Sequence, residues 1–169
     1  MRLFLGIKPT KQALLAIQKL IKTLQAKGIA GNYTDINNIH LTLVFVGETE
    51  ETNKLKSIMN GINSLPFSFQ MNKLTKLKDM FVLEIEKTKE LDELQTRLTD
   101  EIIKQGYPIE KRNFYPHITL VREVKEDLNM NIAINSEVKS FELYLSERIQ
   151  GKIKYSIVHK KILGCEKSD

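Results

Sequence analysis

Residues 40–44 read HLTLV, and residues 117–121 read HITLV, an offset of 77 positions. Upstream of each, residues 3–10 (LFLGIKPT) and 81–88 (FVLEIEKT) also match, at an offset of 78. Each copy predicts a strand, a helix that begins after a threonine, and a second strand that carries the histidine. This duplication predicts two lobes related by a pseudo-two-fold axis, with the two histidine strands facing each other. We expect residues 1–169 to form a single bilobal domain.

Apolar periodicity supplies the other elements. Helical spacing indicates two long helices that follow Thr10 and Thr88 and end at Gly28 and Gly106, with a shorter helix near 50–60. Alternation and short apolar runs predict strands at 2–7, His40–Val46, Phe67–Leu77, Phe81–Glu86 and His117–Val121, and two more around 141–145 and 153–157.

The composition constrains the setting of the protein more than its chemistry. The 169 residues carry a formal net charge of +5, which favours anionic partners, but the basic residues are scattered and do not by themselves indicate RNA. The one cysteine, Cys165, cannot form an internal disulfide or a zinc cluster. No apolar run approaches the length of a membrane span, and the first residues lack the long apolar region of a signal peptide. We expect a cytoplasmic monomer with no membrane partner.

The two His-x-Thr strands are the candidate catalytic elements. Side chains alternate along a strand, so His40 and Thr42 share a face, and His117 and Thr119 do the same. Imidazole titrates near neutral pH, so one histidine can accept a proton from water while the other delivers one to a departing oxygen. Threonine hydroxyls can donate to the non-bridging oxygens of a phosphodiester. This pattern predicts metal-free acid–base chemistry on a phosphodiester, with no cofactor.

Two further residues occupy equivalent places in the repeat. Phe45 and Arg122 each lie five residues after their histidine. This odd offset puts them on the opposite face of an ideal strand, so they reach the cleft only at a strand end or a bend. In the cleft, Phe45 could stack on a base and Arg122 could bind phosphate; otherwise Phe45 belongs to the core and Arg122 to the surface. The third histidine, His159, lacks a matching threonine, and we expect it to be structural or solvated.

The paired motifs resemble those of the two-histidine phosphoesterase superfamily, and in particular its bacterial and archaeal RNA 2′,3′-cyclic phosphodiesterases, also known as 2′-5′ RNA ligases. The resemblance rests on RLFLGIK, NIHLTLVFVGE, FYPHITLVRE and FELYLSERIQGKIKY. It implies a bilobal α+β fold whose antiparallel sheets face a central cleft. It also implies hydrolysis of RNA 2′,3′-cyclic phosphate ends to 2′-phosphomonoesters. His40 would be the general acid that protonates O3′, and His117 the general base. Thr42, Thr119 and Arg122 would bind phosphate, and Phe45 would stack on the terminal base.

Three alternatives remain open at the level of sequence. The same acid–base pair would serve a 2′-5′ RNA ligase, or a cyclic phosphodiesterase that acts on another small cyclic nucleotide. A third alternative is a non-catalytic module that binds RNA ends. Loss of a histidine or threonine from either motif would favour that module, and all four residues are present.

Overall fold

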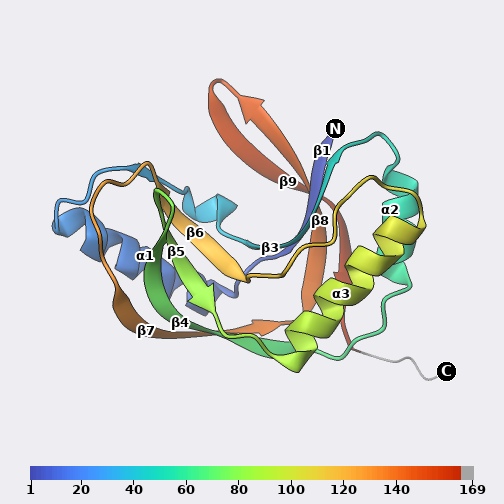
Figure 1. The fold of residues 1–169 in the computed structure, drawn as a ribbon, viewed down its shortest axis with the longest axis horizontal. Coiled ribbons are helices and arrows are strands. Elements are labelled where there is room, and N and C mark those ends of the chain that lie inside the picture. The colour runs from blue at the N-terminus through green and yellow to red at the C-terminus, as the bar shows by residue number, and fades with distance from the viewer. Residues whose placement is uncertain (165–169) are drawn as a thin grey trace.

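A computed structural model describes residues 1–164, so Cys165 lies outside the described residues. These residues form three α-helices, one 3₁₀ turn and nine strands (Figure 1). The helices are α1 (Lys11–Ala26), α2 (Thr52–Asn60) and α3 (Lys89–Lys104), and the 3₁₀ turn is Ile36–Asn38. The strands are β1 (Arg2–Ile7), β2 (Asn32–Tyr33), β3 (Leu41–Glu48), β4 (Phe67–Leu77), β5 (Met80–Ile85), β6 (His117–Arg122), β7 (Met130–Val138), β8 (Ser140–Ile149) and β9 (Lys152–Ile162).

The strands form two antiparallel sheets whose order reflects the sequence repeat. One sheet has the order β3-β1-β8-β9, and the other has the order β2-β6-β5-β4-β7. Because β1 corresponds to β5 in the repeat and β3 corresponds to β6, each histidine strand lies directly beside the first strand of its own repeat. The predicted α+β bilobal fold with duplicated units is confirmed.

The two long helices begin and end as the sequence predicts. The side chains of Thr10 and Thr88 each accept a hydrogen bond from the backbone N–H three residues further on, at 3.2 Å and 3.3 Å. These bonds satisfy N–H groups that the first helical turn leaves without a partner. Gly28 and Gly106 follow the helices with φ of 79° and 96°, a conformation that favours glycine. Each helix then buries one apolar stripe.

Each long helix packs on the sheet that contains the other copy of the repeat. Helix α1 follows β1 of the first sheet but lies against β7 of the second, where the Thr10 N–H donates to Ser136 Oγ at 3.0 Å (Figure 1). Helix α3 follows β5 of the second sheet but contacts β3 of the first, and Gln95 Nε2 donates to the Leu43 carbonyl at 3.4 Å. Helix α2 lies beside α3 and also contacts β9. The two lobes are therefore interlocked.

Strand β7 was not predicted from the sequence. Most of its residues are only half-buried or exposed, with buried positions confined to its last three residues, so its apolar signal is weak. It pairs with β4 at the edge of the second sheet. The short strand β2 was also missed, and it pairs with β6 over two residues. None of the helices in the described part is long and apolar enough to cross a membrane.

Candidate active site

The two histidines lie at the starts of strands that approach each other from the two sheets. His40 directly precedes β3, and His117 is the first residue of β6. His40 Nδ1 lies 2.7 Å from the Asn38 carbonyl oxygen, and His117 Nδ1 lies 2.7 Å from the Tyr115 carbonyl oxygen. A carbonyl oxygen only accepts, so both rings carry a proton on Nδ1. In both histidines the nitrogen left for chemistry is therefore Nε2, which in His40 lies 2.8 Å from Thr42 Oγ1.

Strand β3 contains a β-bulge immediately after Thr42. Gly6 of β1 pairs with Thr42, but the next residue of β1, Leu5, pairs with Val44. Leu43 is thus the extra residue, and Leu43 and Val44 are both buried in succession. A bulge of this kind shifts the alternation of side chains by one position.

Strand β6 contains the same irregularity at the equivalent position. Val82 of β5 pairs with Thr119, and its neighbour Phe81 pairs with Val121, which leaves Leu120 as the extra residue. Leu120 and Val121 are again both buried in succession. The repeat therefore preserves the bulge as well as the sequence motif.

The matched bulges turn Phe45 and Arg122 to the face that carries the threonines. Phe45 is 67% exposed, and its ring centroid lies 6.0 Å from that of Phe4, which also packs against His40. Arg122 is exposed, and its Nη1 lies 3.2 Å from Met80 Sδ. The assignment of Phe45 to the core is therefore wrong, and the bend that would bring both residues to the histidine face is present.

An aromatic cluster surrounds His40. Its ring centroid lies 4.7 Å from Phe4 and 5.0 Å from Tyr155, whose ring meets it edge-on at 87°. Tyr144 lies 6.2 Å from His40 and stacks on Phe4 at 5.0 Å. These contacts hold the imidazole in one orientation and remove it from water.

Burial lowers the pKa of His40 below its ordinary value, because desolvation disfavours the charged imidazolium. The hydrogen bond to the Asn38 carbonyl opposes this shift and raises the pKa, whereas the positive charge of Arg122 lowers it further. His40 is therefore predominantly neutral at neutral pH in the free protein. Strands β3 and β6 are in contact, which brings the two motifs together.

A buried carboxylate lies behind the aromatic cluster. Glu142 is only 3% exposed, and it accepts hydrogen bonds from Ser140 Oγ at 2.6 Å and from the Tyr144 hydroxyl at 3.2 Å. Burial and the adjacent Glu142 raise the pKa of Tyr144, so its hydroxyl stays protonated and continues to donate. This arrangement fixes the Tyr144 ring, against which Phe4 stacks.

His117 has a different environment. Tyr115 stacks on its ring with centroids 5.0 Å apart and planes inclined at 25°. The Tyr115 hydroxyl donates to Glu84 Oε2 at 3.0 Å, and Glu84 pairs directly with His117 across β5 and β6. Burial, followed by the hydrogen bond to Glu84 and its charge, raises the pKa of Tyr115 to about 12. The phenol therefore remains a donor at neutral pH, and Tyr115 and Glu84 together hold one side of the imidazole.

Gly6 allows the backbone of Leu41, next to His40, to approach β1 closely. A Cβ atom at this position would lie 2.9 Å from the Leu41 carbonyl oxygen and 3.6 Å from His40 Cδ2. The first distance is shorter than real Cβ contacts, so any side chain at position 6 would displace backbone next to the histidine.

The sequence motifs therefore account for most of this face but not for its supporting residues. Thr42 and Thr119 are both half-buried, and each lies two residues after its histidine on the same side of the strand. His159 lies outside the cluster, with Nε2 2.9 Å from Asn60 Oδ1, as expected for a structural residue. Tyr115 and Tyr155 were missed, although the position of Tyr115 two residues before His117 was a usable signal. Residues 1–164 contain no group of three or more His, Cys, Asp or Glu side chains placed to hold a metal ion.

The fold is that of known two-lobed α+β proteins of the LigT type. Escherichia coli LigT in its apo form superimposes with a TM-score of 0.83 at 23% identity, over 96% of each chain. The protein TT0787 of Thermus thermophilus gives a TM-score of 0.85 at 19% identity, over 96% of this chain and 97% of that one. Escherichia coli LigT has also been solved in complex with 3′-AMP, and that structure gives a TM-score of 0.79 at 25% identity, over 96% of this chain and 97% of that one.

The sequence identifies the family. The model of the 2′-5′ RNA ligase superfamily matches residues 14–146, and the chain belongs to that superfamily. A Thermotoga maritima protein named RNA 2′,3′-cyclic phosphodiesterase is 30% identical over 132 residues, which cover 72% of this chain and 70% of that protein. A Bacillus subtilis protein of the same name is 34% identical over 93 residues. That match spans only about half of each protein, 50% of this chain and 51% of the relative.

Proposed function

We propose that this protein is an RNA 2′,3′-cyclic phosphodiesterase, a hydrolase that opens the cyclic phosphate at an RNA 3′ end and leaves a 2′-phosphate. The observation that carries the proposal is the pair of equivalent histidines, each with Nδ1 bonded to a carbonyl oxygen, which leaves Nε2 for proton transfer. Relatives that bear the name of this activity support it, as does the nucleotide complex of Escherichia coli LigT.

In the proposed reaction, the two histidines act on opposite sides of phosphorus. His117 Nε2 removes a proton from a water molecule as the water oxygen bonds to phosphorus, and the bond from phosphorus to O3′ breaks. His40 Nε2 delivers a proton to O3′, which is a poor leaving group as an alkoxide. Attack and departure are roughly in line, so the base and the acid must flank the phosphate. The two histidine strands come from different sheets, and this supports such a division.

His40 must carry a second proton to act as the general acid, but its lowered pKa disfavours that proton in the free protein. In the free protein, desolvation favours the neutral imidazole. The negative charge of a bound cyclic phosphate opposes that effect, because a nearby anion stabilises imidazolium. We propose that His40 takes up a proton when the substrate binds, so that the imidazolium forms only when the cyclic phosphate is present in the active site.

The remaining residues of the face would bind the substrate. Thr42 and Thr119 hydroxyls would donate to the non-bridging oxygens, and the exposed guanidinium of Arg122 would neutralise their charge. The exposed ring of Phe45 would stack on the terminal base. The two imidazoles supply both proton transfers, so we propose that the reaction needs neither a metal ion nor a cofactor. We further propose that the protein acts as a single-domain monomer in the cytoplasm.

The decisive experiment incubates purified protein with an RNA oligonucleotide ending in a 2′,3′-cyclic phosphate, in the presence of EDTA. Chromatography against authentic 2′- and 3′-phosphate standards then identifies the product. A 2′-phosphate is expected, with loss of turnover in His40→Ala and His117→Ala. Activity that EDTA abolishes and zinc restores would overturn the metal-free mechanism. Binding without turnover would favour an RNA-end-binding module, and joining of RNA ends without hydrolysis would favour a ligase.

A further inference from the structure

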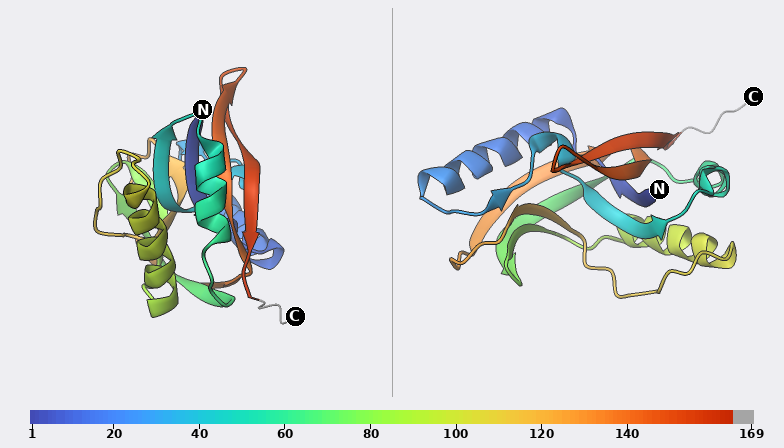
Figure 2. Two further views of the ribbon diagram at one scale, coloured as in Figure 1. Left: turned by 90° about the vertical axis from the view of Figure 1, so that its right-hand side faces the viewer. Right: turned by 90° about the horizontal axis from the view of Figure 1, so that it is seen from above.

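The face that holds His40 continues along the first sheet towards the β8–β9 hairpin, which projects beyond the rest of the molecule (Figures 1 and 2). Residues paired directly across antiparallel strands share a face. Tyr155, which touches His40, pairs with Ser146, and Ser146 pairs with Arg2. One step further out, Ile153 pairs with Arg148. These five residues, here called the hairpin strip, form a continuous surface that begins at His40.

The hairpin strip is open and positively charged. Arg2 and Arg148 are exposed, and Ile153 is 44% exposed. Arg148 Nη1 donates to the Gly151 carbonyl oxygen at 3.0 Å, which holds its side chain at the hairpin turn. Within residues 1–164, neither arginine takes part in an ion pair.

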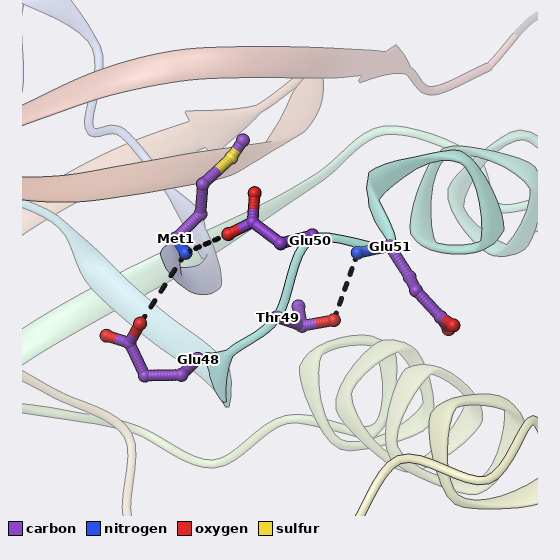
Figure 3. Close-up of polar contacts among 5 residues, drawn as sticks. All are labelled: Met1, Glu48, Thr49, Glu50 and Glu51. Carbon is purple, nitrogen blue, oxygen red and sulfur yellow. Dashed lines mark hydrogen bonds and ion pairs between the residues drawn. The ribbon is translucent and has the colours of Figure 1, made fainter.

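The carboxylate nearest to Arg2 in the sheet is engaged elsewhere. Glu48 pairs with Arg2 across β3 and β1, but its Oε1 lies 3.5 Å from the Met1 ammonium, which also binds Glu50 Oε2 at 2.7 Å (Figure 3). Glu48 therefore shares the face of Arg2, but within residues 1–164 its ion pair is with Met1 and not with Arg2.

The two faces of the hairpin carry different charged residues, arginine on one face and lysine with glutamate on the other. Lys152 and Lys154 alternate with Ile153 and Tyr155, so they lie on the opposite face. Lys154 pairs there with Glu147, so the acidic residue of this part of the hairpin lies away from the arginines. Between Arg2 and Arg148 the arginine face carries only Ser146, Ile153 and Tyr155, and Glu48 lies beside Arg2 at its edge. Positive charge interleaved with apolar and aromatic surface suits single-stranded nucleic acid, in which phosphates and bases alternate.

We infer that the hairpin strip binds the RNA strand on the 5′ side of the cyclic phosphate, with Arg2 and Arg148 on successive backbone phosphates and Tyr155 and Ile153 against the bases or riboses. This inference rests on the proposed function. A 2′,3′-cyclic phosphate is the 3′ terminus of its strand, so every other nucleotide must leave the active site on the 5′ side. Arg2 pairs with Ser146, so Arg2 and Arg148 are diagonal neighbours on adjacent strands, about 7–8 Å apart, which is close to the spacing of successive phosphates in an extended strand. The preferred substrate is therefore an RNA strand rather than a cyclic mononucleotide.

The test compares two substrates and two double variants. The substrates are an RNA of about ten nucleotides with a 2′,3′-cyclic phosphate end, and cytidine 2′,3′-cyclic phosphate. One variant combines Arg2→Ala with Arg148→Ala. Its control combines Lys152→Ala with Lys154→Ala, which removes the same charge from the other face of the hairpin. The quantity compared is kcat/KM as a function of salt, with thermal melting to verify folding.

The arginine variant should lose activity on the oligonucleotide but not on the mononucleotide. Each lost phosphate contact reduces the dependence of log(kcat/KM) on log[salt] by about 0.7 for a single strand, so the slope should fall by about 1.4. The lysine variant should retain the wild-type slope. Equal losses in both variants, an equal loss on the mononucleotide, or no loss in the arginine variant would each overturn the inference. If the wild-type protein hydrolyses neither substrate, the proposed function fails, and fluorescence anisotropy of the oligonucleotide with the same variants still decides the inference.

Discussion

Leu43 of β3 and Leu120 of β6 occupy equivalent positions, and each is the extra residue of a β-bulge that follows the threonine of a His-x-Thr motif. The two bulges shift the side-chain alternation by one position, which brings Phe45 and Arg122 to the face of the histidines. A duplicated backbone thus presents an aromatic ring from one lobe and a guanidinium from the other. The symmetric frame supports two different contacts, one suited to a base and one to phosphate.

Replacing Phe45 with alanine should weaken nucleotide binding without weakening the fold. The ring is 67% exposed, so little burial is lost, whereas a stacked base contributes about 1–3 kcal/mol. The dissociation constant for a non-hydrolysable nucleotide and the melting temperature, measured side by side, check this. Leu65→Ala, at a residue that is 75% exposed, is the control for removing an exposed apolar side chain. A strongly lowered melting temperature with normal binding would return Phe45 to a structural role.

Replacing Gly6 with alanine should slow turnover by displacing His40. The new methyl group would lie 2.9 Å from the Leu41 carbonyl oxygen, so the backbone beside the histidine must shift. A misplacement of about 1 Å in an active site can cost about 10²-fold in rate. Gly61→Ala is the matched control, because its Cβ would meet its neighbours at ordinary distances of 3.5 Å and more. Measurement of kcat together with circular dichroism distinguishes displacement from unfolding, and wild-type kcat in Gly6→Ala would contradict the assignment.

The pH dependence should report the desolvation of His40. Its pKa is lowered, so in the free protein the required imidazolium is lost as pH rises through a value below about 6.5. The alkaline limb of kcat/KM should therefore lie at lower pH than for an ordinary histidine. Bound phosphate raises the pKa, so the alkaline limb of kcat should move to higher pH. Titration of the His40 ring by NMR, with and without inorganic phosphate, measures both values, and an unchanged pKa in phosphate would contradict the loading of the acid by substrate.

The division of labour between the histidines can be tested with a better leaving group. Each histidine should be worth about 10²–10⁴-fold in rate. In a substrate with a 3′-thiolate leaving group, the departing sulfur needs no proton. His40→Ala should then regain much of its lost rate, while His117→Ala should remain slow. The opposite rescue would exchange the acid and the base, and full activity in either single variant on the natural substrate would refute the mechanism.

Tyr115 should act as a positioning residue for His117. Tyr115→Phe keeps the stacked ring but loses the hydrogen bond to Glu84, so a small decrease in kcat is expected. Tyr115→Ala also removes a ring contact worth about 0.5–1.5 kcal/mol, and its kcat should fall further. KM for a cyclic mononucleotide should change little in either variant. A rise in KM with unchanged kcat would instead place Tyr115 in substrate binding.

Local sequence patterns predicted the helices, most strands and the two motifs. The strand irregularities and the side chains around the histidines depend on long-range contacts and were not predicted. Thr10 and Thr88 cap their helices because a capping hydrogen bond depends on residues three positions apart, which the sequence displays directly. The bulges at Leu43 and Leu120 depend on how two strands pair, so alternation along the sequence could not decide whether Phe45 and Arg122 reach the face of the histidines. Tyr155 meets His40 from a strand more than a hundred positions away in the chain, a contact that no local pattern encodes.

The exchange of helices between the lobes has a mechanical consequence. Helix α1 packs on the sheet of the second copy, and α3 contacts the sheet of the first. Each lobe therefore depends on a helix from the other copy of the repeat. A denaturant should therefore meet one cooperative unit, in which the loss of either helix disrupts both halves at once. The separation of the two imidazoles is then fixed by the folding of the whole chain, because neither histidine strand is held in place unless both lobes are folded.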